Sequence, residues 1–134
     1  LIGNWDNSEY GKKLKNEDLE FKNIFLLEPI YDQQVLNQIR SNCFIYIHGH
    51  SAGGTNPSLV EAMYLELPIF AFAAMYNKET TQNKAKYFHT SIDLINLLKA
   101  LVEEDLKIIG KNMKMIAKKE YTWSIISKKY SQLF

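Results

Sequence analysis

The chain has 134 residues, of which 46% are hydrophobic and 23% are charged, with one cysteine and a formal net charge of +1. A chain of this length and composition forms one ordinary folded domain, which excludes the collagen-like, low-complexity and disordered classes. The single cysteine excludes a disulfide framework and an all-cysteine zinc site, and the longest apolar stretch, residues 67–75, is too short to cross a bilayer.

The first third of the chain predicts two short strands and two helices. A strand remnant covers residues 1–3, a short helix follows over residues 9–15, and the apolar run at 23–27 has the length of a strand. Asp32 is placed to cap the next helix. One face of that helix carries three apolar residues, Val35, Leu36 and Ile39. Because the chain begins with Leu at what resembles the end of a strand, we expect it to be part of a longer protein.

The middle of the chain predicts two buried strands with a helix between them. Residues 43–47 and 67–72 are rich in β-branched and aromatic side chains, which favour strands. Between them lie a loop over residues 48–56 and a helix that Pro57 opens and that ends near residue 65.

The last part of the chain begins with a long polar loop over residues 75–87 and a short edge strand over 87–89. Three helices follow, over about 91–103, 104–118 and 122–133. Strands and helices alternate with short loops, and the strands are apolar on both faces. The sequence therefore predicts one α/β domain over residues 1–134, with a doubly wound, Rossmann-like parallel sheet.

The loop over residues 48–56 leaves a buried strand at the edge where open α/β sheets bind ligands. Gly53 and Gly54 allow a ligand to approach the backbone closely, and Asn56 with Pro57 marks the start of a helix. The free N–H groups and the dipole of that helix attract an anion, and we expect a phosphate there. A tight strand-to-helix corner explains the two glycines equally well.

Glu61 lies just over one turn into this helix, on the same side as Pro57. A carboxylate in that place can accept hydrogen bonds from the neighbouring hydroxyls of a ribose. The alternative is a capping box in which Glu61 pairs with Ser58, and the spacing alone slightly favours this alternative.

The stretch from His48 to Met63, followed by Leu67, Pro68 and Ile69, resembles the nucleotide-sugar loop of the group-1 (family-four) retaining glycosyltransferases. The branch that it resembles most is the rhamnosyltransferase-like one, which serves capsule and O-antigen (lipopolysaccharide) assembly. The similarity continues into four other segments, at residues 3–11, 29–32, 76–81 and 121–123. It therefore covers nearly the whole chain.

This resemblance implies most of the C-terminal, donor-binding half of a GT-B enzyme. The acceptor-binding half and the family's diphosphate-binding Arg/Lys pair would then lie upstream of Leu1, so that the chain alone is expected to be inactive. The resemblance assigns the nucleotide-sugar donor to eight residues, His50, Ser51, Gly53, Gly54, Thr55, Asn56, Ser58 and Glu61. Two further segments are candidates for contacts with the base or the rest of the donor, namely Pro29, Ile30 and Tyr31, and Asn77, Lys78 and Glu79. A plain turn at residues 29–31 and a solvated Lys78 are the alternatives.

The activity implied by the resemblance is transfer of a sugar, with rhamnose suggested by the branch, to a polysaccharide or lipid-linked glycan acceptor with retention of configuration. Glu61 matches the second glutamate of the family's paired-glutamate motif, whereas Gly53 replaces the first. His50, a candidate catalytic residue, or Ser51 would then stand beside the transferred sugar. No metal or other cofactor is expected. A sugar-nucleotide epimerase of GT-B architecture and a non-catalytic nucleotide-binding or interaction module are the alternatives.

Charge is distributed unevenly, since residues 1–66 carry five basic and nine acidic side chains and residues 67–134 carry eleven basic and six acidic ones. This excess is too small to indicate a nucleic-acid partner. Four lysines share one face of the helix at 104–118, namely Lys107, Lys111, Lys114 and Lys118. A solvated face is the favoured interpretation, and contact with anionic lipid at the inner face of the cytoplasmic membrane is the alternative. In either case we expect a cytoplasmic protein.

Overall fold

The computed structural model describes residues 1–18 and 21–133. The chain divides into two compact units, Leu1–Ile39 and Arg40–Phe134, which are described separately. The first unit contains the 3₁₀ turn η1 (Trp5–Asn7) and helix α1 (Glu9–Asp18), which confirms the predicted helix and extends it. Helix α2 (Gln33–Ser41) begins in the first unit and ends in the second.

The prediction of two strands in the first unit is wrong, because the described residues there form only an isolated bridge. Ile2 and Leu27 form a single parallel bridge, beside which the amino group of Leu1 donates to the Phe25 carbonyl and the Leu27 N–H donates to the Leu1 carbonyl, both at 2.8 Å. The carbonyl of Leu27 accepts from the main-chain N–H of Gly3 and from the indole Nε1 of Trp5, at 3.1 and 2.9 Å. The next bond of a parallel ladder would need an N–H at position 29, and Pro29 has none, so the pairing ends at Leu27.

The start of α2 agrees with the prediction. The carboxylate of Asp32 accepts hydrogen bonds from the main-chain N–H groups of Gln34 and Val35, at 2.8 and 3.2 Å. A side-chain acceptor in this position satisfies N–H groups that have no partner within the helix. Asp32 is therefore the residue at which this helix begins.

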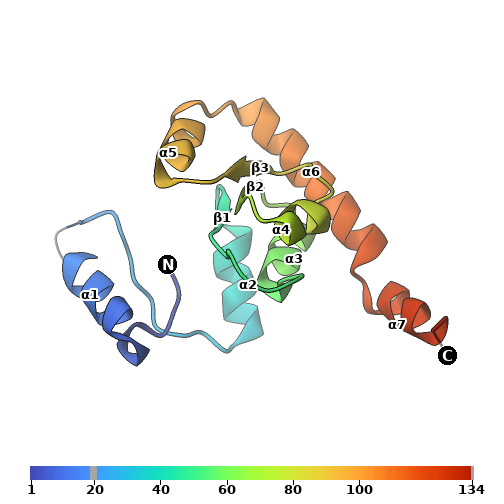
Figure 1. The fold of residues 1–134 in the computed structure, drawn as a ribbon, viewed down its shortest axis with the longest axis horizontal. Coiled ribbons are helices and arrows are strands. Elements are labelled where there is room, and N and C mark those ends of the chain that lie inside the picture. The colour runs from blue at the N-terminus through green and yellow to red at the C-terminus, as the bar shows by residue number, and fades with distance from the viewer. Residues whose placement is uncertain (19–20, 134) are drawn as a thin grey trace. The chain divides into compact units, whose positions relative to one another are not determined.

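The second unit is an α/β arrangement around a three-stranded parallel sheet, as predicted (Figure 1). The strands are β1 (Tyr46–His48), β2 (Ile69–Phe72) and β3 (Lys86–Phe88), hydrogen-bonded in the order β1-β2-β3. Helix α3 (Pro57–Tyr64) connects β1 to β2. β1 is shorter and less buried than expected, because it is the outermost of the described strands on its side and Ile47 is 45% exposed.

The polar loop predicted over residues 75–87 is wrong, because it contains helix α4 (Met75–Thr80) between β2 and β3. Three helices then complete the chain as expected, although the first is shorter than predicted. They are α5 (Ser91–Lys99), α6 (Glu103–Glu120) and α7 (Trp123–Ser131). A capping box between Thr90 and Asp93 fixes the start of α5.

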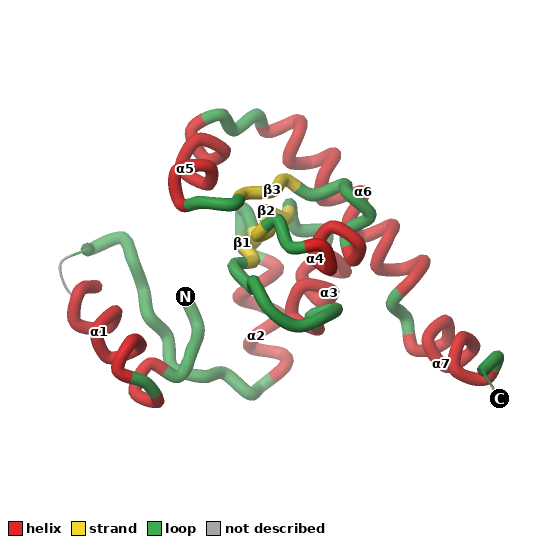
Figure 2. The backbone as a smooth tube through the Cα atoms, in the orientation of Figure 1, coloured by secondary structure: helices red, strands yellow, loops and turns green. Residues whose placement is uncertain are grey.

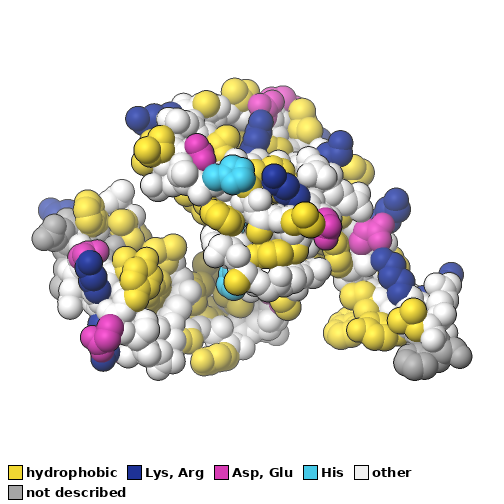
Figure 3. All heavy atoms as spheres, viewed as in Figure 1, with side chains coloured by type: hydrophobic (Ala, Val, Ile, Leu, Met, Phe, Trp, Pro, Cys, Tyr) yellow, Lys and Arg dark blue, Asp and Glu magenta, His cyan; other side chains and the backbone are white. Residues whose placement is uncertain are grey.

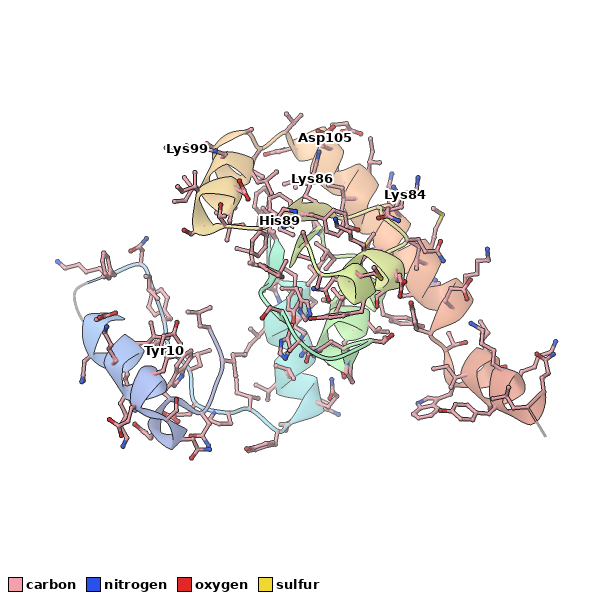
Figure 4. All side chains as sticks on the ribbon, viewed as in Figure 1. Tyr10, Lys84, Lys86, His89, Lys99 and Asp105 are labelled. Atoms are coloured by element: carbon pink, nitrogen blue, oxygen red, sulfur yellow. The ribbon has the colours of Figure 1, made fainter. Side chains whose placement is uncertain are left out.

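Helices pack on both faces of β2. Ile69 and Ala71 point to one face, where they join a core formed largely by α3 and α6, with members such as Leu59, Met63, Ile109, Met113 and Ile116. Phe70 points to the opposite face and lines a small cavity of about 100 Å³ with Leu97 of α5. The side chains of Lys86 and Asp105, labelled in Figure 4, line the same cavity.

Helix α7 exposes large apolar side chains. Trp123 and Tyr130 expose 85% and 64% of their area, Leu133 just beyond the helix exposes 75%, and hydrophobic side chains gather on this helix in Figure 3. None of the helices in the described part of the chain combines the length and the hydropathy that crossing a bilayer requires.

Candidate functional site

The loop between β1 and α3 lies at the carboxyl end of the parallel sheet (Figure 2). Residues 49–55 are all exposed. The main-chain N–H groups of residues 51–55 donate no hydrogen bond to any of the described residues. An exposed backbone with free donors is the feature that an anion-binding loop requires.

The first N–H groups of α3, by contrast, are already bonded. The N–H of Ser58 donates to the Asn56 side-chain oxygen at 2.9 Å, and the N–H of Leu59 donates to the Asn56 carbonyl at 3.1 Å. Pro57 has no N–H to offer. The structure thus confirms Asn56 and Pro57 as the start of the helix, but the expectation of free helix N–H groups is wrong. The free donors lie in the loop before the helix.

The two adjacent glycines of the loop differ in conformation. Gly53 has a φ of +106°, a region that other residues rarely adopt. No atom lies within 4 Å of an ideal Cβ at Gly53 or at Gly54. The fold therefore explains the glycine at position 53 through its backbone angle, whereas packing within the chain does not require a glycine at position 54.

Glu61 forms an ion pair with Arg40, whose guanidinium Nη1 donates to Glu61 Oε2. The side chain of Arg40 is only 10% exposed and that of Glu61 is 40% exposed. The alternative of a capping box with Ser58 is wrong, because Asn56 caps the helix. Arg40 was not predicted from the sequence, although it lies four residues after Leu36, on the apolar face of its helix.

Tyr46, His48 and His50 form a continuous stack from β1 into the loop. The rings of Tyr46 and His48 are 6.0 Å apart between centroids, and those of His48 and His50 are 5.3 Å apart and inclined by only 14°. His48 is 3% exposed, and its Nε2 has no partner among the described residues. Burial, and then the neighbouring His50, lower the pKa of His48 to about 4.

This shifted pKa predicts a loss of stability at mildly acidic pH. The unfolded chain takes up a proton near pH 6.5, whereas folded His48 stays neutral down to its lowered pKa of about 4. Acidification from pH 7.5 to pH 5 should therefore lower the free energy of unfolding by about 2 kcal/mol through this residue. Urea unfolding at the two pH values measures the effect. The non-titrating variant His48→Phe should lose it, and an unchanged pH dependence in that variant would contradict the assignment.

The expected donor segment after β2 lies within α4. Asn77 is fully buried, and its side-chain amide donates to the carbonyls of His50 and Phe72 at 3.0 and 2.9 Å. The Lys78 ammonium lies 5.7 Å from the ring centre of Tyr87, and Glu79 is exposed. The Asn77 side chain therefore donates a hydrogen bond to the backbone of the candidate loop. This contact was not predicted from the sequence.

The other candidate segment for contacts with the donor lies in the first unit. Pro29, Ile30 and Tyr31 belong to the first unit, and Tyr31 is 90% exposed. His89, labelled in Figure 4, follows β3, where its main-chain N–H donates to Asp93 at 3.0 Å. Lys114 of the lysine face pairs with Glu66 at 2.7 Å.

In the part of the chain that the structure describes, no three His, Cys, Asp or Glu side chains come together as potential metal ligands. The chain has no significant match among protein-family models, curated proteins or solved structures.

Proposed function

We propose that this chain is the nucleotide-sugar-binding part of a retaining glycosyltransferase, with its sheet forming part of the C-terminal half of a doubly wound GT-B fold. The single observation that carries the proposal is the exposed loop of residues 51–55, whose N–H groups have no partner among the described residues. The parallel sheet supports it, because such sheets bind ligands beyond the carboxyl ends of their strands.

The residues of the loop and Glu61 of α3 bind different parts of the donor. The N–H groups of Gly53, Gly54 and Thr55 bind the diphosphate, and the imidazole of His50 faces the sugar. Glu61, which is 40% exposed beside Arg40, keeps one carboxylate oxygen for a hydroxyl of the ribose. In the transfer step the bond between the anomeric carbon and the diphosphate oxygen breaks, and the acceptor hydroxyl oxygen bonds to that carbon. The departing diphosphate takes the hydroxyl proton, and the loop N–H groups stabilise its developing charge.

The acceptor, a polysaccharide or lipid-linked glycan, would bind to a further domain of the complete protein, in the cytoplasm. Lys107, Lys111 and Lys118 of α6 are exposed, which suits a peripheral contact with an anionic membrane surface.

Calorimetric titration of the chain with UDP and with dTDP tests the donor site. Gly54→Val should raise the dissociation constant of the nucleotide at least about tenfold, because a side chain there keeps the diphosphate from the backbone. The thermal midpoint should not change, since nothing lies within 4 Å of the added Cβ.

Gly49→Val is the matched control, because position 49 is equally open, precedes the proposed donors and should leave the affinity unchanged. The proposal is wrong if the wild-type chain binds neither nucleotide, or if Gly54→Val binds as tightly as the wild type.

A further inference from the structure

Asn77 connects the ends of two neighbouring strands. One N–H of its side chain donates to the carbonyl of Phe72, the last residue of β2, and another to the carbonyl of His50, two residues beyond β1. The residue is fully buried. Two well-formed hydrogen bonds from one buried amide hold His50, at the start of the loop between β1 and α3, at a fixed distance from the sheet.

Chemistry fixes the orientation of this amide. Its Oδ1 has no hydrogen-bond partner among the described residues, whereas both acceptors that it meets are carbonyl oxygens. A flipped amide would set its oxygen against those two carbonyls, which is repulsive. Asn77 therefore acts here as a double donor, a role that aspartate, with nearly the same shape, cannot fill.

His50 is held in two places. Asn77 binds its carbonyl, which the Tyr76 hydroxyl also approaches at 3.5 Å, and its ring stacks on that of His48. His48 is itself buried at the end of β1. A residue fixed by both its backbone and its ring presents a pre-organised surface to a ligand, and so less conformational entropy is lost on binding.

We propose that Asn77 is a positioning residue, which fixes His50 and the adjoining residues 51–55 so that a nucleotide diphosphate meets an ordered site. The part of this inference that concerns the ligand rests on the proposed function. The part that concerns the loop does not, and it can be measured in the free protein.

Two substitutions test the inference. Asn77→Ala removes both donors, and Asn77→Asp replaces them with an oxygen that repels the carbonyls of His50 and Phe72. The NMR order parameter of the His50 amide should fall in both variants, and the ring-proton shifts that His50 owes to stacking on His48 should move toward random-coil values. The dissociation constants of UDP and dTDP should rise about tenfold, as expected when a loop must be ordered on binding.

Thr81→Val is the control for stability. Thr81 is as buried as Asn77, and its hydroxyl donates to the Asn77 carbonyl at 2.7 Å, but the hydrogen bonds of this hydroxyl among the described residues go to Asn77, Lys78 and Tyr87 and not to the loop. This variant should lower the thermal midpoint while leaving the His50 signals and the nucleotide affinity unchanged. The inference would be overturned if the His50 NMR signals in Asn77→Ala were the same as in the wild type. It would also be overturned if the His50 order parameter fell while the nucleotide dissociation constants stayed unchanged. A wild-type chain that binds no nucleotide would remove the proposed function, and the NMR measurement alone would then decide whether Asn77 anchors the loop.

Discussion

Replacing Glu61 with alanine should lower the free energy of unfolding by about 3 kcal/mol. The substitution leaves the Arg40 guanidinium, which is only 10% exposed, without the one carboxylate that pairs with it among the described residues. A buried charge that loses its partner keeps the full cost of desolvation. Denaturant unfolding of the two proteins measures the difference.

Removing the other partner of this ion pair should lower the free energy of unfolding much less. Arg40→Met leaves a Glu61 side chain that is 40% exposed and can be hydrated, so we expect a loss of about 1 kcal/mol. Glu79→Ala, on an exposed glutamate of α4, serves as the control and should change stability by less than about 0.5 kcal/mol. Equal losses in Glu61→Ala and Arg40→Met would show that the asymmetry in burial does not govern this pair.

This asymmetry decides how a ribose contact of Glu61 can be tested. Glu61→Ala would weaken ligand binding through the fold even if Glu61 never touched a ligand. Glu61→Gln keeps one side-chain oxygen for Arg40, but it removes the negative charge and replaces the other oxygen with an NH2 group. A fall in nucleotide affinity in Glu61→Gln, with an unchanged thermal midpoint, is therefore the result that assigns Glu61 to the ligand.

Gly110→Ala should destabilise the second unit by about 2 kcal/mol, even though alanine is the better helix former by about 1 kcal/mol. An ideal Cβ at Gly110 would lie 2.3 Å from the main-chain oxygen of Glu66, at the turn between α3 and β2. Glu66 has a φ of +66°, and its N–H donates to the Met63 carbonyl at 3.0 Å, so this peptide has little freedom to move away. Helix α6 would have to withdraw from α3 and open the core around Met63 and Met113.

Thermal unfolding of Gly110→Ala beside Gly49→Ala checks this expectation. Position 49 has no atom within 4 Å of an ideal Cβ, so its variant should unfold with the wild type. If Gly110→Ala were as stable as Gly49→Ala, α6 would not be in backbone contact with the turn between α3 and β2.

Features with a local cause were predictable from the sequence. Asp32 and Asn56 begin their helices because their own side chains accept the nearest free N–H groups. The strand around Ile69 was predictable because its side chains are buried on both faces, and so its sequence is apolar without a break. The loop at 48–56 was predictable because it lies between an apolar strand segment and the helix start at Asn56.

Features with a tertiary cause were not predictable. Helix α4 has no apolar periodicity, and it is held instead by the buried hydrogen bonds of Asn77 and Thr81, whose hydroxyl also meets the Tyr87 hydroxyl. Arg40 of α2 can be buried because Glu61 of α3 pairs with its charge. The sequence of α2 alone does not indicate that α3 supplies this partner. The apolar run at 23–27 has the composition of a strand, but its pairing with residues 1–3 stops after one bridge at Leu27, because Pro29 has no N–H to continue a ladder.

The order β1-β2-β3 has a consequence for how the second unit is assembled during synthesis. Each strand pairs with the one made immediately before it, so the sheet can grow at one edge as the polypeptide leaves the ribosome, without inserting a strand between two others. His50, Phe72 and Asn77 all precede β3 in the chain. Their hydrogen bonds therefore do not require β3 to have paired with the sheet.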